Sequence, residues 1–267
     1  MITPQRNMND HQPQAVSFFV AIHKDAPLPP ARANYVALGL GGYRSPTYPY
    51  AFSDDTGDSI SPRNKHYSEL TGWYWIWKNV ADVDMLGLCH YRRYFLLDNK
   101  KFFFFRRRKR YFQPTPDYFN YITAQKHTAF AETLLSNHDV IVPQRIQLGV
   151  SLSAHYAVCH AQEDWDLFIE GIRALYPQYT SEIKWFDKTH YIHPYNMMIA
   201  RKDFFDRYMS SLFPLLFWIE KKNPFRTDPY QCRVPAFLAE RFFTFYLHVG
   251  SARYVEQPIA TLEPSAF

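Results

Sequence analysis

The sequence has 267 residues and a mass of 31.7 kDa, and it is 47% hydrophobic and 21% charged, which predicts a sizeable packed core and excludes disordered and fibrous classes. The net charge of +5 is mild, and no apolar stretch approaches the roughly 20 residues that a membrane-spanning helix needs. Three cysteines without a CxxC spacing favour reduced thiols, so we expect a cytoplasmic protein.

Strand and helix signals alternate along the chain after a polar stretch at residues 1–14, which we expect to be a flexible N-terminus without a signal peptide. Residues 15–22 predict a buried strand, residues 25–60 a long loop, and residues 62–79 a helix with Ser61 as its N-cap. The later predicted elements are strands at 85–89, 139–143 and 195–200, and helices at 151–176, 203–221 and 235–248. This alternation predicts an α/β domain over residues 15–267, with a mixed central sheet flanked by helices.

Polar side chains follow two of the predicted strands, at the edge where open α/β sheets bind ligands. They are His23 and Lys24 after the first strand, and His90, Tyr91, Arg92 and Arg93 after the central strand. Paired arginines match the oxygens of a diphosphate without needing a metal. In the alternative interpretation, one arginine pairs with a buried carboxylate and the tyrosine packs in the core.

An acidic turn lies within the predicted loop. Its carboxylates are Asp54, Asp55 and Asp58. Carboxylates grouped in this way bind a metal or sugar hydroxyls, or they belong to a capped surface turn. Both interpretations stay open at this point.

A basic and aromatic patch stands out near the middle of the chain. It consists of Phe102, Phe103, Phe104, Phe105, Arg106, Arg107, Arg108, Lys109 and Arg110. Basic side chains attract anionic lipid headgroups while aromatic rings enter the headgroup boundary, so this pattern favours docking to the inner face of the membrane, where it also meets an acceptor. A solvated charge run is the alternative. A nucleic-acid site, in which the cations contact phosphates and the rings stack on bases, is a further alternative. A single short patch supports it weakly, so we expect no nucleic-acid partner.

Three segments of the chain together resemble a known family. They are DDTGDSIS at 54–61 followed by Glu69, Leu70 and Thr71, then GLCHYRRYF at 87–95, and finally residues 194–198 and 233–241. They are similar to a bacterial glycosyltransferase-like family catalogued as domain of unknown function 4422, found in capsule, exopolysaccharide and O-antigen gene clusters. The resemblance covers about residues 16–250.

The resemblance implies a GT-A-like fold that binds a nucleotide sugar and transfers the sugar to a growing glycan. UDP is the favoured carrier, a galactose-type hexose the favoured sugar, and a lipid-linked or oligosaccharide chain the expected acceptor. These expectations describe a cytoplasmic enzyme that works peripherally on the inner face of the cell membrane. The competing hypothesis is a non-catalytic basic module that binds anionic lipid or nucleic acid.

The metal requirement is left open by the sequence. GT-A enzymes normally place an Asp-x-Asp motif after a central strand, where it holds Mn²⁺ or Mg²⁺ on the diphosphate. Here Asp82 and Asp84 precede the predicted strand at 85–89, and cationic side chains follow it. We therefore expect little or no metal dependence, although His90 offers one metal ligand.

Glu240 is the first candidate for a catalytic base, because an inverting transfer must remove a proton from the acceptor hydroxyl. Its neighbour Arg241 is expected to hold a carboxylate or phosphate, and the alternative is a structural ion pair between the two. Asp54 and Asp55 compete for the catalytic role. Asn196 is expected at the sheet edge, facing the donor or the acceptor.

Overall fold

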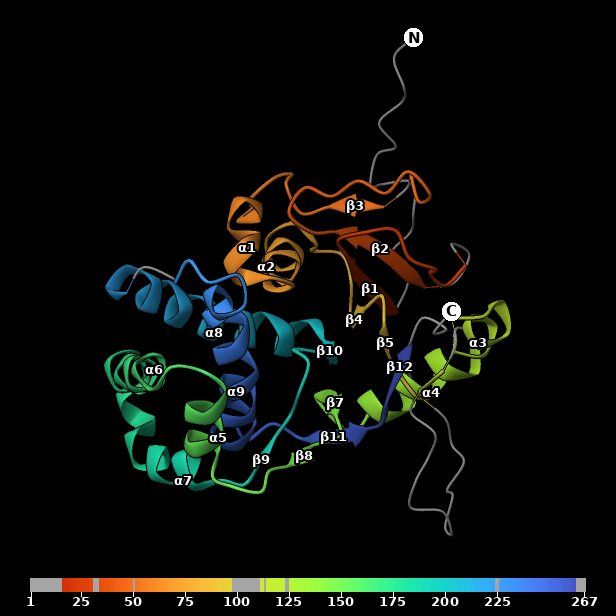
Figure 1. Cartoon of the computed structure of the whole chain (residues 1–267). Helices are drawn as coiled ribbons and strands as arrows, with labels where there is room; N and C mark the ends of the chain where they lie inside the picture. Colours follow the sequence, from red (N-terminus) through yellow and green to blue (C-terminus); the bar gives the residue numbers. More distant parts are fainter. Residues whose placement is uncertain are drawn as a thin grey trace.

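The computed structural model describes residues 16–30, 34–49, 51–97, 111–112, 114–122, 125–223 and 226–262, and in them ten strands form a mixed sheet (Figure 1). The main path of the sheet runs β11-β7-β10-β4-β1-β2-β3, and β5, which pairs with β4 and β12, joins β12 and β6 to it. The strands are β1 (Val16–Ile22), β2 (Tyr35–Gly39), β3 (Phe52–Ser53), β4 (Met85–His90), β5 (Arg93–Phe95), β6 (Tyr111–Phe112), β7 (Val140–Pro143), β10 (Met198–Arg201), β11 (Tyr254–Gln257) and β12 (Ile259–Leu262). A separate pair joins β8 (Ile146–Gln147) to β9 (Tyr191–Ile192).

The polarity of the central strands gathers chain ends at one edge of the sheet. Strands β1, β2 and β4 are parallel, so their carboxyl ends lie together. Strand β10 is antiparallel to β4, with Met198 opposite Leu88, so the residues just before β10 reach that same edge. The residues that follow β1 and β4 and those that precede β10 therefore meet.

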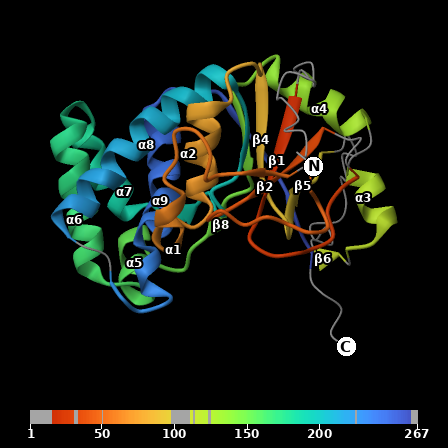
Figure 2. The same ribbon diagram turned by 90° about the horizontal axis from the view of Figure 1, so that it is seen from above.

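Helices cover both faces of the sheet (Figure 2). They are α1 (Asn64–Tyr67), α2 (Leu70–Asn79), α3 (Pro116–Ile122), α4 (Gln125–Leu135), α5 (Leu152–Cys159), α6 (Gln162–Leu175), α7 (Ile183–Lys188), α8 (Lys202–Lys222) and α9 (Val234–Val249), with short 3₁₀ turns at Ser61–Arg63, Pro177–Glu182 and Gln231–Arg233.

Side chains alternate across the sheet because the repeat of a strand is two residues. Phe19 and Ala21 of β1 pack into a core with α2, α8 and α9, whereas Phe18 and Val20 face a second core with α3 and α4. The α/β class with a mixed central sheet flanked by helices is thus confirmed. In the part of the chain that the structure describes, the helices are too short or too polar to cross a membrane.

Three predicted elements differ from the structure. The predicted loop at 25–60 contains β2 and β3, whose short runs sit among prolines and glycines. The predicted helix at 62–79 breaks at Ser68, where φ is 50°, and the Asn64 amide donates to the Ser68 carbonyl there. The predicted helix at 151–176 is divided into α5 and α6, with Ser151 capping α5 as expected.

Residues 1–14 and 102–110 lie outside the described residues. The expectation of a flexible N-terminus and that of a membrane-docking patch therefore stay predictions.

Candidate functional site

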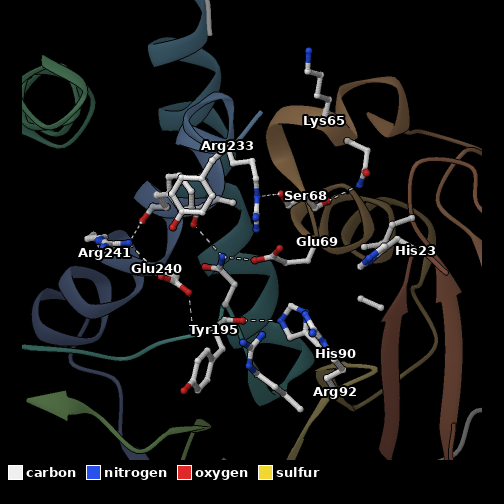
Figure 3. Close-up of a pocket in the computed structure, with 18 of the residues that line it drawn as sticks. His23, Lys65, Ser68, Glu69, His90, Arg92, Tyr195, Arg233, Glu240 and Arg241 are labelled. Atoms are coloured by element: carbon white, nitrogen blue, oxygen red, sulfur yellow. Dashed lines mark hydrogen bonds and ion pairs between the residues drawn. The ribbon is translucent and has the colours of Figure 1, made fainter. Parts of the chain in front are cut away.

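A cavity of about 730 Å³ lies at the sheet edge where these chain ends meet (Figure 3). Its walls come from the ends of β1 and β4, the α1–α2 break, the turn before β10, the end of α5 and the first half of α9. The polar side chains that line it are His23, Asn64, Lys65, Ser68, Glu69, His90, Tyr91, Arg92, Arg93, His155, His160, Tyr195, Asn196, Tyr230, Arg233, Glu240 and Arg241.

His90 ends β4 and has a fixed tautomer. Its Nε2 lies 2.8 Å from the carbonyl oxygen of Tyr195, and because a carbonyl only accepts, the Nε2 carries the proton. Burial lowers the pKa of His90, and Arg93 and Arg92 lower it further, although Glu69 and the Tyr195 carbonyl act in the opposite direction. The imidazole is therefore neutral near pH 7, with its lone pair on Nδ1.

The turn before β10 holds two residues in the left-handed region, with φ of 78° at Tyr195 and 47° at Asn196. Such backbone is costly outside glycine, so the surrounding contacts must hold it in place. The Tyr195 N–H donates to Glu240 Oε1 at 2.8 Å, and the Asn196 amide donates to Glu69 Oε1 at 2.7 Å. This one strained dipeptide therefore orients three titratable side chains, because the Tyr195 carbonyl also accepts from His90.

Glu240 projects from α9 into the cavity. Its other carboxylate oxygen accepts from Arg241 Nη1 at 3.2 Å, and Arg241 also donates to the Phe237 carbonyl at 3.0 Å. Burial raises the pKa of Glu240 and the nearby Glu69 adds to this, against the opposing effects of Arg241 and the Tyr195 N–H. A carboxylate with a raised pKa accepts a proton more readily near pH 7.

Cationic side chains outnumber the carboxylates in the cavity. Among the described lining residues, five carry a fixed positive charge (Lys65, Arg92, Arg93, Arg233 and Arg241) and two carry a carboxylate (Glu69 and Glu240). The Arg93 guanidinium lies over the Tyr195 ring at 4.5 Å, and Arg233 Nε donates to Ser68 Oγ at 2.9 Å. The excess positive charge suits an anionic ligand of the size of a nucleoside diphosphate.

Most of the residues that the sequence indicated for catalysis or donor binding lie in this cavity. They are His23, His90, Tyr91, Arg92, Arg93, Asn196, Glu240 and Arg241. Lys24 is not part of the lining, and its Nζ lies 5.9 Å from the centre of the Tyr91 ring.

The acidic turn is not brought into the cavity. Asp54 is completely buried and accepts hydrogen bonds from the Gly41 and Gly42 N–H groups and from the Ser61 and Thr71 hydroxyls. Both of its oxygens are thus used to hold the loop that follows β2, where Gly41 and Gly42 have φ of 62° and 75°. This position corrects the catalytic role expected for Asp54, since a carboxylate enclosed by four donors has no access to a substrate.

The other two acidic residues of the turn are also engaged elsewhere. Asp55 pairs with Arg44 at 3.0 Å, and Asp58 accepts from the Tyr74 hydroxyl at 3.0 Å. The structure therefore supports the interpretation of a capped turn for this segment, and neither side chain lines the cavity.

The structure adds residues that the sequence analysis did not select for the site. Glu69 and Arg233 stand inside the family-like segments, so a signal for them was present. His160, Tyr230 and Phe237 form an aromatic wall. Phe237 also stands inside a family-like segment, but no local pattern brings it together with His160, which follows α5, and Tyr230, which precedes the 3₁₀ turn at Gln231–Arg233.

No cluster of three or more His, Cys, Asp or Glu side chains with the arrangement of a metal site occurs among the described residues. Asp82 and Asp84 precede Met85, the first residue of β4, and so lie at the opposite edge of the sheet from the cavity. The described lining, with five cations and two carboxylates, differs from the oxygen-rich set of ligands that Mg²⁺ prefers.

Comparisons with known proteins found a family model and a similar solved structure. The family model described as "Domain of unknown function (DUF4422)" matches residues 17–251. A solved apo structure of the bifunctional glycosyltransferase WbbM is similar at 25% identity with a TM-score of 0.81, over 94% of this chain. The match covers 46% of that protein, so the chain spans about half the length of this neighbour. No curated protein matches.

Proposed function

The chain belongs to the DUF4422 family, and we propose that it is a glycosyltransferase that binds a nucleotide-sugar donor and a glycan acceptor in the cavity at the sheet edge. The proposal rests on one observation. The cavity combines an excess of positive charge with the half-buried carboxylate of Glu240, whose pKa is raised. The similarity to a bifunctional glycosyltransferase supports the reaction class.

The donor diphosphate is proposed to lie against the strand ends, where Arg92 and Arg93 neutralise its charge. Arg92 is exposed and can follow the ligand, whereas Arg93 is held by stacking on Tyr195. Charge that develops on the leaving diphosphate is stabilised by guanidinium groups already in place, which lowers the barrier without reorganisation. His23 and His90 complete this side with neutral rings, because burial lowers the pKa of both.

Glu240 is proposed as the base of an inverting transfer. The acceptor oxygen forms a bond to the anomeric carbon, the bond from that carbon to the diphosphate oxygen breaks with its electron pair leaving on the diphosphate, and the acceptor proton moves to Glu240. Each oxygen of Glu240 accepts one N–H, from Tyr195 or Arg241, so a lone pair on each is left for the substrate.

The finer assignment rests on the family and on chemistry. We propose UDP as the carrier, a galactose-type hexose as the sugar, and a lipid-linked or oligosaccharide acceptor of a surface polysaccharide as the substrate. Such an enzyme works at the inner face of the membrane, and the basic segment 102–110 is its proposed docking element. No observation on the described residues favours the non-catalytic binding module instead.

The test is binding of a panel of nucleoside diphosphates and nucleotide sugars, measured by the rise in melting temperature and by calorimetry. We expect a selective response to UDP and to one UDP-sugar, retained in EDTA. No response to any nucleotide would refute the proposal. Sugar transfer that is lost in EDTA and restored by Mn²⁺ would refute the metal-independent chemistry alone.

A further inference from the structure

The side of the cavity formed by α5 and α9 differs in chemistry from the strand side. There His160 stacks on Phe237 with ring centres 4.0 Å apart, and Tyr230 packs on Phe237 at 5.2 Å. The His160 and Tyr230 rings are also nearly parallel, at an angle of 19°. The three rings line the cavity together, and Tyr230 keeps 55% of its surface exposed.

This aromatic wall is uncharged. Burial lowers the pKa of His160 to about 4, in spite of the hydrogen bond to the Gln231 side chain, so the ring is neutral at physiological pH. An exposed aromatic surface inside an otherwise charged cavity is suited to the flat apolar face of a ring-shaped ligand. Two such ligands belong to a glycosyl transfer, a sugar of the acceptor and the base of the nucleotide.

The position of the wall on α9 distinguishes between them. Phe237, Glu240 and Arg241 have helical spacings of three and four residues, so they share one face of the helix. Three residues of helix, a rise of about 4.5 Å, separate Phe237 from Glu240. Figure 3 shows Glu240 and Arg241 on the side of the cavity opposite to His23. A ring on the wall is therefore next to the proposed base, which must contact the acceptor hydroxyl.

We infer that His160, Tyr230 and Phe237 form the acceptor subsite, on which a neutral sugar ring of the acceptor stacks with one hydroxyl directed at Glu240. This inference rests on the proposed function and adds the place and the chemical class of the second substrate. The three rings themselves carry no charge, Arg241 is already paired with Glu240, and the Arg233 guanidinium lies 5.6 Å from the centre of the Phe237 ring. We propose a neutral hexose because the stacking surface is formed by the uncharged rings.

The experiment uses the full chain loaded with UDP and, as probes, the methyl glycosides of galactose, glucose, mannose and N-acetylglucosamine. Binding of each probe is followed by saturation-transfer NMR, and UDP binding by calorimetry. The variants are Tyr230→Ala, which removes the ring, and Tyr230→Phe, which keeps it. Tyr121→Ala is the matched control, because Tyr121 is a partly exposed tyrosine on α3 outside the cavity.

We expect Tyr230→Ala to weaken binding of the preferred glycoside about tenfold, the equivalent of one lost aromatic contact. Its UDP affinity should stay within about twofold of the wild type, and Tyr230→Phe and Tyr121→Ala should bind like the wild type. If Tyr230→Ala weakens UDP instead, the wall holds the base and the inference is wrong. Absence of glycoside binding to the UDP-loaded wild type would also overturn it, whereas absence of UDP binding would overturn the proposed function itself.

Discussion

Asn196 provides the sharpest test of how the cavity is built, since its side chain and its backbone contribute separately. Its amide donates to Glu69 Oε1 at 2.7 Å and to the Ala236 carbonyl at 3.1 Å, and its backbone has φ of 47°. Asn196→Gly removes both hydrogen bonds but accepts the backbone, whereas Asn196→Ala removes the bonds and must also adopt the left-handed conformation.

The magnitudes follow from these contacts. Two lost hydrogen bonds, one of them to a carboxylate, cost about 2–4 kcal/mol of unfolding free energy. Part of this loss is offset because both substitutions also remove the buried Asn196 Oδ1, which lacks a partner among the described residues. We therefore expect Asn196→Gly to be less stable than the wild type by about 2 kcal/mol. The alanine variant should lose about 1 kcal/mol more because of its positive φ.

Urea unfolding of both variants measures these losses. The exposed Asn137 serves as control, since Asn137→Ala should change stability by less than about 0.5 kcal/mol. Sugar transfer should fall about a hundredfold in both cavity variants, because Tyr195 would no longer fix Glu240 and His90. Equal stability of the alanine and glycine variants would refute the strain argument, and wild-type turnover in both would refute the positioning role of the turn.

Four other outcomes are expected. Glu240→Gln should lower kcat about 10²- to 10⁴-fold with little change in UDP affinity, as measured by initial rates and calorimetry, because an amide cannot take the acceptor proton. Arg93→Ala should weaken UDP binding about tenfold or more, while Arg44→Ala, outside the cavity, leaves it unchanged in the same calorimetric titration. Asp54→Asn should lower the unfolding free energy measured in urea by about 2–4 kcal/mol without altering nucleotide affinity, because the amide NH₂ would face groups that donate hydrogen bonds to the Asp54 carboxylate. Burial lowers the pKa of His193 to about 4 in the folded state, whereas the unfolded chain has the ordinary value of 6.5. As the pH falls from 6.5 toward 4, the unfolded chain therefore binds the proton before the folded chain does, and the unfolding free energy should drop by about 3 kcal/mol. The drop should be smaller in His193→Gln.

Elements with strong local patterns were predictable from the amino-acid sequence. The short apolar run of β1 predicts a buried strand. In α8 and α9 the apolar residues recur every three or four positions, which predicts helices because this spacing places them on one buried face. Chemistry at strand ends was also predictable, since His90 and Arg93 follow a run too apolar to lie anywhere but in the centre of a sheet. Glu240 was indicated by its apolar helix neighbours.

Which of these groups meet depends on contacts between segments that are far apart in the sequence. Asp54 has the same carboxylate as Glu240, yet four donors from three separate segments enclose it, and no local pattern encodes such a network. Ser68 breaks a continuous helical pattern because contacts from Asn64 and Arg233 hold its positive φ. The aromatic wall joins His160 to Phe237 across 77 residues of sequence, and such long-range packing depends on how α5 and α9 are placed on the sheet.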